Sequence, residues 1–256
     1  PTMGNLHAGH LSLMELAGSR ADKVICSIFV NPTQFGAADD LDRYPRTEAQ
    51  DEAMLTAQGQ VDFLFLPDNS TIYPFGTESS VAVNLPEFSK ELCGAFRPGH
   101  FNGVASVVLR LLNIVTPDFL VLGEKDYQQR ILLTRMLQDL HLPFTVVAGE
   151  IFREPDGLAM SSRNSYLTPE ERIEAPKLYA ALQEIAKAVR LGRTDYRELE
   201  TATIAILSDL GFRSDYIAVR RASDLATSEN WGTGDARIIL GAAWLGSARL
   251  IDNVVV

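Results

Sequence analysis

The chain has 256 residues, enough for one large domain or two modest ones. It is 46% hydrophobic and 22% charged, a composition that can bury a sizeable core and that excludes a disordered or low-complexity chain. Its 23 Lys and Arg residues against 33 Asp and Glu residues give a net charge of −10. That charge disfavours an extensive interface with the phosphate backbone of a nucleic acid.

Membrane and disulfide classes are also disfavoured. The apolar stretch 104–115 is interrupted by Arg110 and Asn113 and falls short of the roughly 18 residues that a membrane span needs. Cys26 and Cys93, the two cysteines, do not have the spacing of paired metal ligands. This usage argues against a disulfide framework and a Cys-based zinc site, and it predicts a reducing, cytoplasmic compartment with no membrane partner.

The first half of the chain alternates strand-like and helix-like segments. Apolar, β-branched runs predict strands, and apolar residues at helical spacing predict helices. The strands are expected at 23–30, 61–66, 119–122 and 144–148, and the helices at 11–21, 47–58, 104–115 and 131–140. This alternation predicts a Rossmann-like α/β domain with a doubly wound parallel sheet, whose apolar strands are buried on both faces.

The second half predicts a smaller C-terminal α+β domain. Thr168, Pro169 and Glu171 have the pattern of a capping box, and the helix that they start is expected to run to Leu191. A second helix is expected at 195–210, and strands at 216–220, 237–245 and 248–255, the last two joined by a hairpin turn at Gly246 and Ser247. We therefore predict two domains, residues 1–151 and 152–256.

The sequence His7-Ala8-Gly9-His10 lies at the opening of a predicted helix. Two imidazoles three residues apart share a helical face, and the free N–H groups of a helix start favour phosphate. The pair could stabilise charge that builds on a transferring phosphate. Two zinc ligands or a solvated helix start are the alternatives, and the spacing alone leaves them open.

Two further polar clusters point to phosphate. Residues 123–126 follow a predicted strand, where Lys125 could neutralise phosphate charge and Asp126 could hold a ribose hydroxyl. Residues 157–164 place two serines beside Arg163, whose planar guanidinium can bind phosphate oxygens. Taken singly, each cluster could be an ordinary turn.

A third group of side chains points to a small acid. Gln34 and Gln129 each follow a predicted strand, so their amides are expected at one rim of the sheet. Arg97 and His100 could take a carboxylate, or could only anchor a loop. Cationic and hydroxyl groups in an otherwise acidic chain predict a transferase that uses ATP or another nucleotide and acts on a small acid.

Six motifs carry a family resemblance: PTMGNLHAGH, NPTQF, YPRT, RPGHFNGV, GEKDYQQ and DGLAMSSRNSYL. In this order they closely resemble the pantothenate synthetase family, the pantoate–β-alanine ligases, from Pro1 to about Leu167 and more loosely beyond. The family belongs to the nucleotidyltransferases with a HIGH-type signature, here His7 to His10, and a KMSKS-like signature, here Met160 to Arg163. The resemblance implies that ATP and pantoate form pantoyl adenylate with Mg²⁺, and that β-alanine then displaces AMP.

The resemblance also implies the site residues. ATP would contact Met3, Gly4, Asn5, Leu6, His7, Ala8, Gly9, His10, Gly123, Glu124, Lys125, Asp126, Phe152, Met160, Ser161, Ser162 and Arg163. Pantoate and β-alanine would contact Gln34, Gln129, Tyr44, Arg97 and His100, beside a wall formed by Val104, Val107, Val108 and Leu111. The implied catalytic residues are His10, His7, Lys125, Ser161, Ser162 and Arg163. His10 falls at the family's proton donor, although we favour electrostatic stabilisation, because pyrophosphate bound to Mg²⁺ and Lys needs little protonation.

The chain departs from the family pattern in two places. Family members have a segment and a first strand before the PTMG motif, so we expect the natural protein to be longer at its N-terminus. The acidic residue that members use near Mg²⁺ after YPRT is not clearly matched. We expect Mg²⁺ to be held mainly by the ATP phosphates, with Asp51 as a candidate protein ligand.

Three rival functions remain to be weighed. Another HIGH-type nucleotidyltransferase would lack RPGHF and the paired glutamines, and a tRNA synthetase relative is disfavoured by the charge of −10. An inactive nucleotide-binding module on the same fold is the rival of a different class, against which intact His7, His10 and Lys125 argue. The resemblance further implies a homodimer that binds no nucleic acid.

Overall fold

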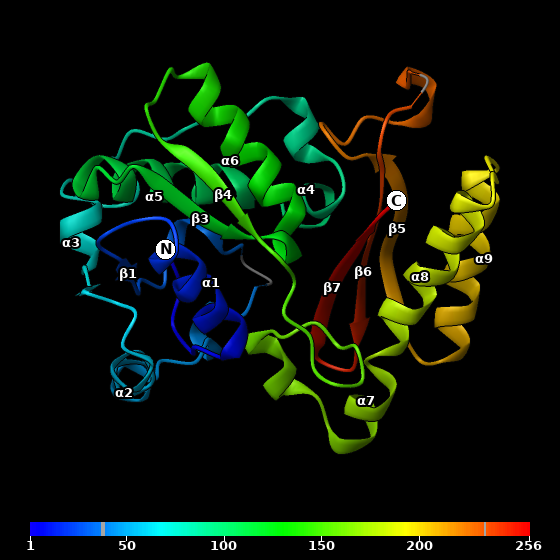
Figure 1. The fold of residues 1–256 in the computed structure, drawn as a ribbon, viewed down its shortest axis with the longest axis horizontal. Coiled ribbons are helices and arrows are strands. Elements are labelled where there is room, and N and C mark those ends of the chain that lie inside the picture. Colours follow the sequence, from blue (N-terminus) through cyan, green and yellow to red (C-terminus); the bar gives the residue numbers. More distant parts are fainter. Residues whose placement is uncertain (37–38, 233) are drawn as a thin grey trace. The chain divides into compact units, whose positions relative to one another are not determined.

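The computed structural model describes residues 1–36, 39–232 and 234–256, and the chain divides into two compact units (Figure 1). The first unit comprises Pro1–Glu124 and Leu132–Glu150, and the second comprises Lys125–Ile131 and Ile151–Val256. The assignment of Lys125–Ile131 to the second unit has no signal in the sequence. The domain limits 1–151 and 152–256 stay a prediction.

Two pairs of parallel strands form the sheets of the first unit. Strand β1 (Ile25–Ser27) pairs with β2 (Phe63–Phe65), and β3 (Phe119–Gly123) pairs with β4 (Thr145–Gly149). Parallel strands that alternate with helices confirm the predicted α/β class. β1 and β2 are shorter than predicted.

The prediction that these strands are buried on both faces is wrong. Ile25 and Phe63 are partners in the β1–β2 register, so they lie on the same face, and they are 41% and 58% exposed. Cys26, the next residue, points to the opposite face and is fully buried. The error arises because an apolar run reports side-chain type and not whether a partner covers each face.

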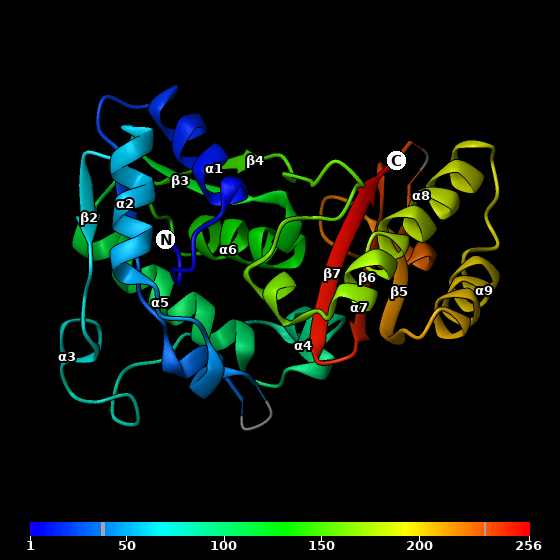
Figure 2. The ribbon, with the colours of Figure 1, turned by 90° about the horizontal axis from the view of Figure 1, so that it is seen from below.

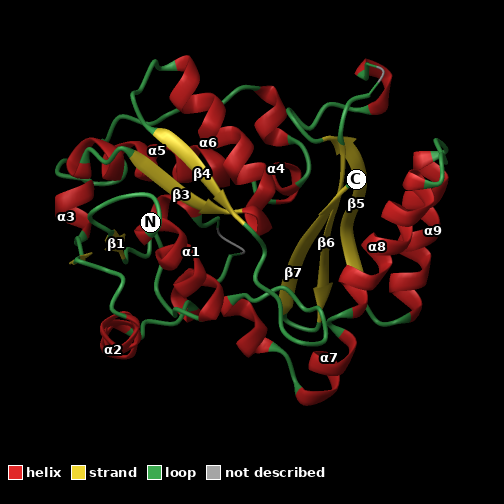
Figure 3. Ribbon diagram, viewed as in Figure 1, coloured by secondary structure: helices red, strands yellow, loops and turns green. Residues whose placement is uncertain are grey.

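Helices pack around these strands in the first unit (Figure 3). They are α1 (Ala8–Gly18), α2 (Glu48–Gln58), α3 (Asn69–Ile72), α4 (Cys93–Phe96), α5 (His100–Val115) and α6 (Tyr127–Asp139), whose first residues belong to the second unit. α1 and α2 lie side by side (Figure 2) and share an apolar cluster with Cys26. The predicted stripe of α5, Val104, Val107, Val108 and Leu111, is buried in the main core with Leu120 and Leu132.

The second unit is an antiparallel sheet covered by helices. Its strands β5 (Arg213–Arg221), β6 (Arg237–Leu245) and β7 (Ala248–Val255) pair in that order, and α8 (Lys177–Arg190) and α9 (Tyr196–Asp209) pack against them. Gly246 has a φ of +53° in the turn between β6 and β7, as a tight hairpin requires. This arrangement confirms the predicted α+β part.

The predicted helix from Thr168 to Leu191 is broken in two. The capping box is present, since the Thr168 hydroxyl accepts the Glu171 N–H and the Glu171 carboxylate accepts the Thr168 N–H. Helix α7 (Pro169–Glu174) then ends, and α8 begins after Pro176. Because proline has no N–H to donate and its ring crowds the preceding turn, the chain restarts its helix there.

Short 3-10 helices complete the connections, among them η1 (Pro32–Gln34), η4 (Glu124–Asp126) and η5 (Ser162–Tyr166). η2 (Leu41–Arg43), η3 (Glu87–Lys90) and η6 (Ser228–Asn230) are the others within the described ranges. In the part of the chain that the structure describes, every helix is too short or too polar to cross a bilayer.

Candidate active site

The loop that precedes α1 is tied to α2 by a buried carboxylate. Gly4 and Asn5 both have positive φ, +78° and +51°, so the chain turns sharply here. Asp51, only 1% exposed, accepts the N–H groups of Asn5 and Leu6 at 2.9 and 2.8 Å. The Thr47 hydroxyl donates to the same carboxylate at 3.1 Å. These bonds fix the backbone of Asn5 and Leu6, immediately before the HIGH-type segment.

These bonds define the surroundings of Asp51, whose role as a candidate Mg²⁺ ligand stays a prediction. Both of its oxygens already accept backbone N–H groups, which hold the carboxylate in the loop. Among the residues that the structure describes, moreover, His, Cys, Asp and Glu do not form a group of three or more that could hold a metal ion. The zinc interpretation of His7 and His10 therefore finds no third ligand among the described residues. A magnesium ion held mainly by the ATP phosphates needs only one or two protein carboxylates, so it requires no such group.

The two imidazoles of the HIGH-type segment lie against each other. His7 is the N-cap of α1, with an extended φ of −146°, and His10 lies in the first turn. The ring centroids are 4.0 Å apart, and the His7 N–H donates to Nδ1 of His10 at 3.3 Å. A neutral His10 that accepts at Nδ1 carries its proton on Nε2, so it presents a hydrogen-bond donor.

Gln34 is oriented by a buried residue that the sequence analysis did not single out, Asn31. The Asn31 amide donates to Oε1 of Gln34 at 3.1 Å, while its own oxygen accepts the hydroxyls of Tyr73 at 2.6 Å and Thr33 at 3.0 Å. Gln34 is itself buried, and its Nε2 donates to the Met3 sulfur at 3.2 Å. It is suited to donate to the oxygen of a carboxylate or hydroxyl ligand.

A sequence signal for Asn31 did exist. An Asn directly before a Pro at the end of a strand is the pattern of an N-cap, and the Asn31 side chain accepts the Thr33 N–H at the start of η1. What the sequence could not indicate is that this cap is 1% exposed and bonds to four partners, two of them from distant parts of the chain.

Arg97 and His100 lie behind Gln34 in a chain of hydrogen bonds. Arg97 binds the carboxylate of Asp39 with two nitrogens, at 3.2 and 3.0 Å, and its third nitrogen lies 2.9 Å from Nε2 of His100. Since a guanidinium only donates, His100 accepts at Nε2 and donates from Nδ1 to the Gln34 carbonyl at 2.7 Å. Both residues therefore support the backbone of Gln34.

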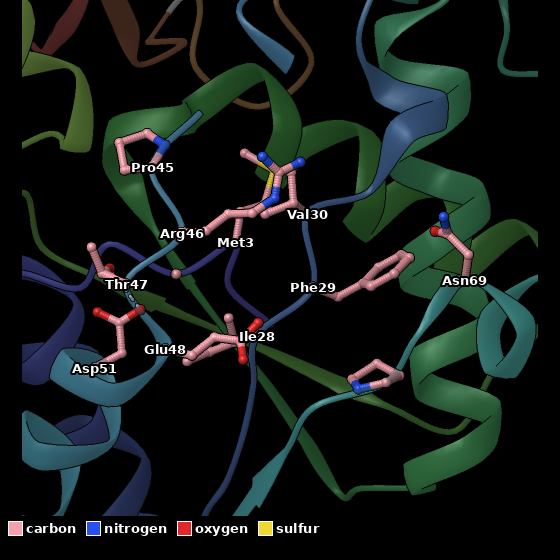
Figure 4. Close-up of a pocket in the computed structure, with 12 residues that line it drawn as sticks. Met3, Ile28, Phe29, Val30, Pro45, Arg46, Thr47, Glu48, Asp51 and Asn69 are labelled. Atoms are coloured by element: carbon pink, nitrogen blue, oxygen red, sulfur yellow. Dashed lines mark hydrogen bonds between the residues drawn. The ribbon is translucent and has the colours of Figure 1, made fainter. Parts of the chain in front are cut away.

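Tyr44 and Met3, two of the predicted site residues, have different surroundings. Tyr44 is buried, with its ring edge-on to Phe35 at 5.9 Å. Met3 and Gly4 open onto a pocket of about 230 Å³ within the first unit (Figure 4). Its other walls are residues 28–30, 45–48, Asp51, Pro67 and Asn69.

In the second unit the structure brings together two segments that the sequence places far apart. Lys125 and Ser161 line one small pocket of about 10 Å³, along with Asn164 and Asp252. The Ser161 hydroxyl accepts the Arg163 N–H at 3.2 Å, so the loop that holds both serines is locally ordered. The Lys125 ammonium lies 3.5 Å from the Asp126 carboxylate.

The remaining predicted residues lie around these groups. Gly123 ends β3 and Glu124 begins η4 in the first unit. Phe152 is 43% exposed, and its carbonyl accepts the Met160 N–H at 2.9 Å. Gln129 is half-buried in the first turn of α6, next to the buried Gln128.

Known proteins resemble the chain along its whole length. The sequence profile of the pantoate–β-alanine ligase family matches residues 1–255. A pantothenate synthetase from Methylococcus capsulatus is 49% identical over 256 residues, which is 100% of this chain and 88% of the relative.

Solved structures agree with this similarity. Pantothenate synthetase from Thermus thermophilus has a TM-score of 0.90 at 43% identity, covering 99% of this chain and 91% of that one. A pantoate–β-alanine ligase from Francisella tularensis, complexed with β-γ ATP and β-alanine, has a TM-score of 0.80 at 37% identity, covering 99% and 87%.

The close approach of α5 to η1 gives a first prediction. A Cβ at Gly103 would lie 2.2 Å from the Thr33 carbonyl oxygen and 2.7 Å from Cα of Gln34. We expect Gly103→Ala to lower the free energy of unfolding by about 1 to 3 kcal/mol, measured by urea denaturation. The reason is that the backbone of Thr33 and Gln34, or that of α5, must move to admit the methyl group. Gly36→Ala, whose nearest such atom is 3.8 Å away, is the control. Equal stability of the two variants would contradict this account.

The Asp39–Arg97 pair gives a second prediction, on pH. Burial raises the pKa of Asp39, but hydrogen bonds from Arg97 and the Gly36 N–H outweigh it, so the pKa lies below its usual 3.8. A lowered pKa adds stability that is complete above 3.8 and is lost as the pH falls through the folded value. The stability difference between the native chain and Asp39→Asn should therefore shrink between pH 7 and about pH 3 in chemical denaturation. A difference that stays constant over this pH range would contradict it.

Proposed function

Because the chain belongs to the pantoate–β-alanine ligase family, we propose that it condenses pantoate with β-alanine at the expense of ATP, giving pantothenate, AMP and pyrophosphate. The observation that carries the proposal is the family match over residues 1–255. The geometry of each unit supports it, since the HIGH-type segment, the donor face of Gln34 and the Lys125–Ser161 pocket are all ordered.

In the first step, an oxygen of the pantoate carboxylate attacks the α-phosphorus of ATP. An O–P bond forms, the bond from that phosphorus to pyrophosphate breaks, and pantoyl adenylate results. We assign ATP contacts to Met3–His10 and Gly123–Glu124 in the first unit, and to Lys125–Asp126, Phe152 and Met160–Arg163 in the second. Positioning and charge stabilisation are the main contributions that a protein makes to such a transfer.

His10 and Lys125 carry the charge stabilisation in this proposal. Nε2–H of His10 donates to a phosphate oxygen, and the ammonium of Lys125 neutralises the charge that develops on the leaving pyrophosphate. His7, Ser161, Ser162 and Arg163 add donors to the same phosphates. Mg²⁺ would neutralise phosphate charge while carried by ATP itself, and no step is assigned to it.

In the second step, the amine of β-alanine attacks the acyl carbon of pantoyl adenylate. The new C–N bond replaces the C–O bond to AMP, and the amine loses a proton. Gln34 donates to pantoate and β-alanine through its Nε2, in place of the bond to the Met3 sulfur, and Gln129 contacts pantoate. Asn31, Arg97 and His100 hold Gln34 in place, and Tyr44 packs beside it through Phe35.

We also propose that the protein is a cytoplasmic homodimer, as the family resemblance implies. Light scattering on the protein as it elutes from a size-exclusion column measures its molar mass. A dimer should have twice the mass of the single chain.

The function is tested by an assay of AMP formation. We expect AMP to appear only when ATP, pantoate and β-alanine are all present, because the adenylate must form before the amine can displace AMP. Omission of β-alanine should leave a single turnover of pyrophosphate release that depends on pantoate. ATP binding without AMP formation would instead support the inactive nucleotide-binding module.

The role of His10 is tested by two substitutions. His10→Ala should lower kcat about 10²- to 10³-fold, because one donor to the phosphates is lost. His10→Gln should keep kcat within roughly tenfold of native, since an amide Nε2 donates a hydrogen bond but does not act as an acid. The exposed His141→Asn is the control.

Each outcome for His10 separates two roles. If His10→Gln lowers kcat as far as His10→Ala does, the imidazole acts by donating a proton and not by electrostatic stabilisation. If Ala leaves adenylation unchanged, both roles are wrong.

A further inference from the structure

Two adjacent buried polar residues lie on β7 in the second unit. Asp252 and Asn253 are 5% and 4% exposed. Neighbouring side chains on a strand point to opposite faces of the sheet. Asp252 pairs with Gly241, which lies beside the α8 residue Leu182, so Asp252 faces the helices and Asn253 faces the other side. Polar groups so deeply buried need specific partners.

Asp252 binds Arg153 in a buried, two-pronged ion pair. Two guanidinium nitrogens of Arg153 lie 2.7 and 2.8 Å from the two carboxylate oxygens. The guanidinium also stacks over the Tyr179 ring, 3.5 Å from its centroid, and donates to the Gly157 carbonyl at 3.0 Å. Arg153 is therefore held from three directions in a fixed geometry.

Arg153 begins the hairpin that leads into the KMSKS-like loop. It forms a β-bridge with Ala159, and the hairpin is closed by bonds from the Glu154 N–H to the Leu158 carbonyl at 2.8 Å and from the Met160 N–H to the Phe152 carbonyl at 2.9 Å. Met160–Arg163 follows with no intervening residue. An anchor at Arg153 consequently fixes the base of that loop.

Asn253 anchors the other phosphate-binding segment. Its amide donates to the Lys125 carbonyl at 3.2 Å. Lys125 and Ser161 line the same small pocket as Asp252, so both anchored segments converge beside β7.

We propose that Asp252 and Asn253 are positioning residues for ATP, which hold Lys125 and the Met160–Arg163 loop at a fixed spacing. The inference rests on the proposed function. Triphosphate binding by several donors needs those donors to be held in place in advance, and a misplacement of about 1 Å can lower activity about a hundredfold. β7 sets this spacing because its neighbouring residues hold one segment from each face.

The test compares two buried ion pairs of the same sheet. Arg249 of β7 and Asp215 of β5 form a pair at 2.7 Å, with side chains 12% and 5% exposed. Because Asp215 lies on β5 and binds Arg249 of β7 instead of Arg153, Asp215→Asn is the matched control for Asp252→Asn. Both variants remove one buried charge and keep the side-chain shape.

In the full chain, we expect Asp252→Asn to raise KM for ATP about 10- to 100-fold, with KM for β-alanine within about twofold of native. Asn253→Ala should act in the same direction. Hydrogen exchange of the amides at 157–164 should speed up in Asp252→Asn only. Asp252→Asn and Asp215→Asn should lower the midpoint of thermal unfolding by similar amounts. Asp215→Asn should nevertheless leave KM for ATP unchanged.

The opposite results would overturn the proposal. Equal rises of KM for ATP in Asp252→Asn and Asp215→Asn would mean a general loss of stability, and no rise in either would mean no positioning role. Equilibrium binding of ATP to the same variants separates this inference from the proposed function. A native chain that binds ATP but forms no AMP overturns the proposed function. In that case the ATP affinities of the variants still show whether Asp252 and Asn253 position the ATP-binding groups. A native chain that binds no ATP overturns both.

Discussion

The organisation of the first unit depends on the carboxylate of Asp51. A buried carboxylate is unfavourable unless hydrogen bonds replace its lost water, and here two backbone N–H groups and one hydroxyl do so. In return, the carboxylate holds Asn5 in a backbone conformation that non-glycine residues seldom adopt. The direction in which α1 leaves this loop, and hence the position of His7 and His10, follows from that one group.

The same physical device recurs around the other proposed ligand groups. Asn31 orients the amide of Gln34, and His100 holds the backbone of Gln34. In each case a buried polar side chain, which cannot touch solvent, fixes a group that can meet a ligand. Low local dielectric strengthens such bonds and makes their loss costly, so the ligand groups are held by partners that have little freedom to move.

Much of the architecture could be predicted from the sequence because it follows local rules. β6 and β7 have the predicted limits, since each is a strand-like run and the turn at Gly246 and Ser247 marks where one ends and the other begins. The helix break at Pro176 was missed because the apolar spacing continues on both sides of it. The exposed face of Ile25 and Phe63 was missed because coverage of a strand is decided by tertiary packing.

The candidate site divides in the same way. Motifs with a known order, such as His7 to His10 and Met160 to Arg163, identify the ligand groups through the family resemblance. Residues that hold them, such as Asp252 and Asn253, have no local pattern, because their partners lie 99 and 128 positions away in sequence. The part that Asp51 plays in the loop before α1 was missed for the same reason, since only the fold shows which N–H groups its oxygens accept.

The contact at Gly103 has a consequence for recombination between related chains. Helix α5 approaches the Thr33 carbonyl so closely that a side chain at this position has no room. Residues 31–34 and 100–103 are therefore one unit of exchange, although they are far apart in the sequence. A chimaera whose crossover falls between these segments would pack the backbone of one parent against that of the other. Its site keeps its geometry only if both parents have the same spacing between the two segments.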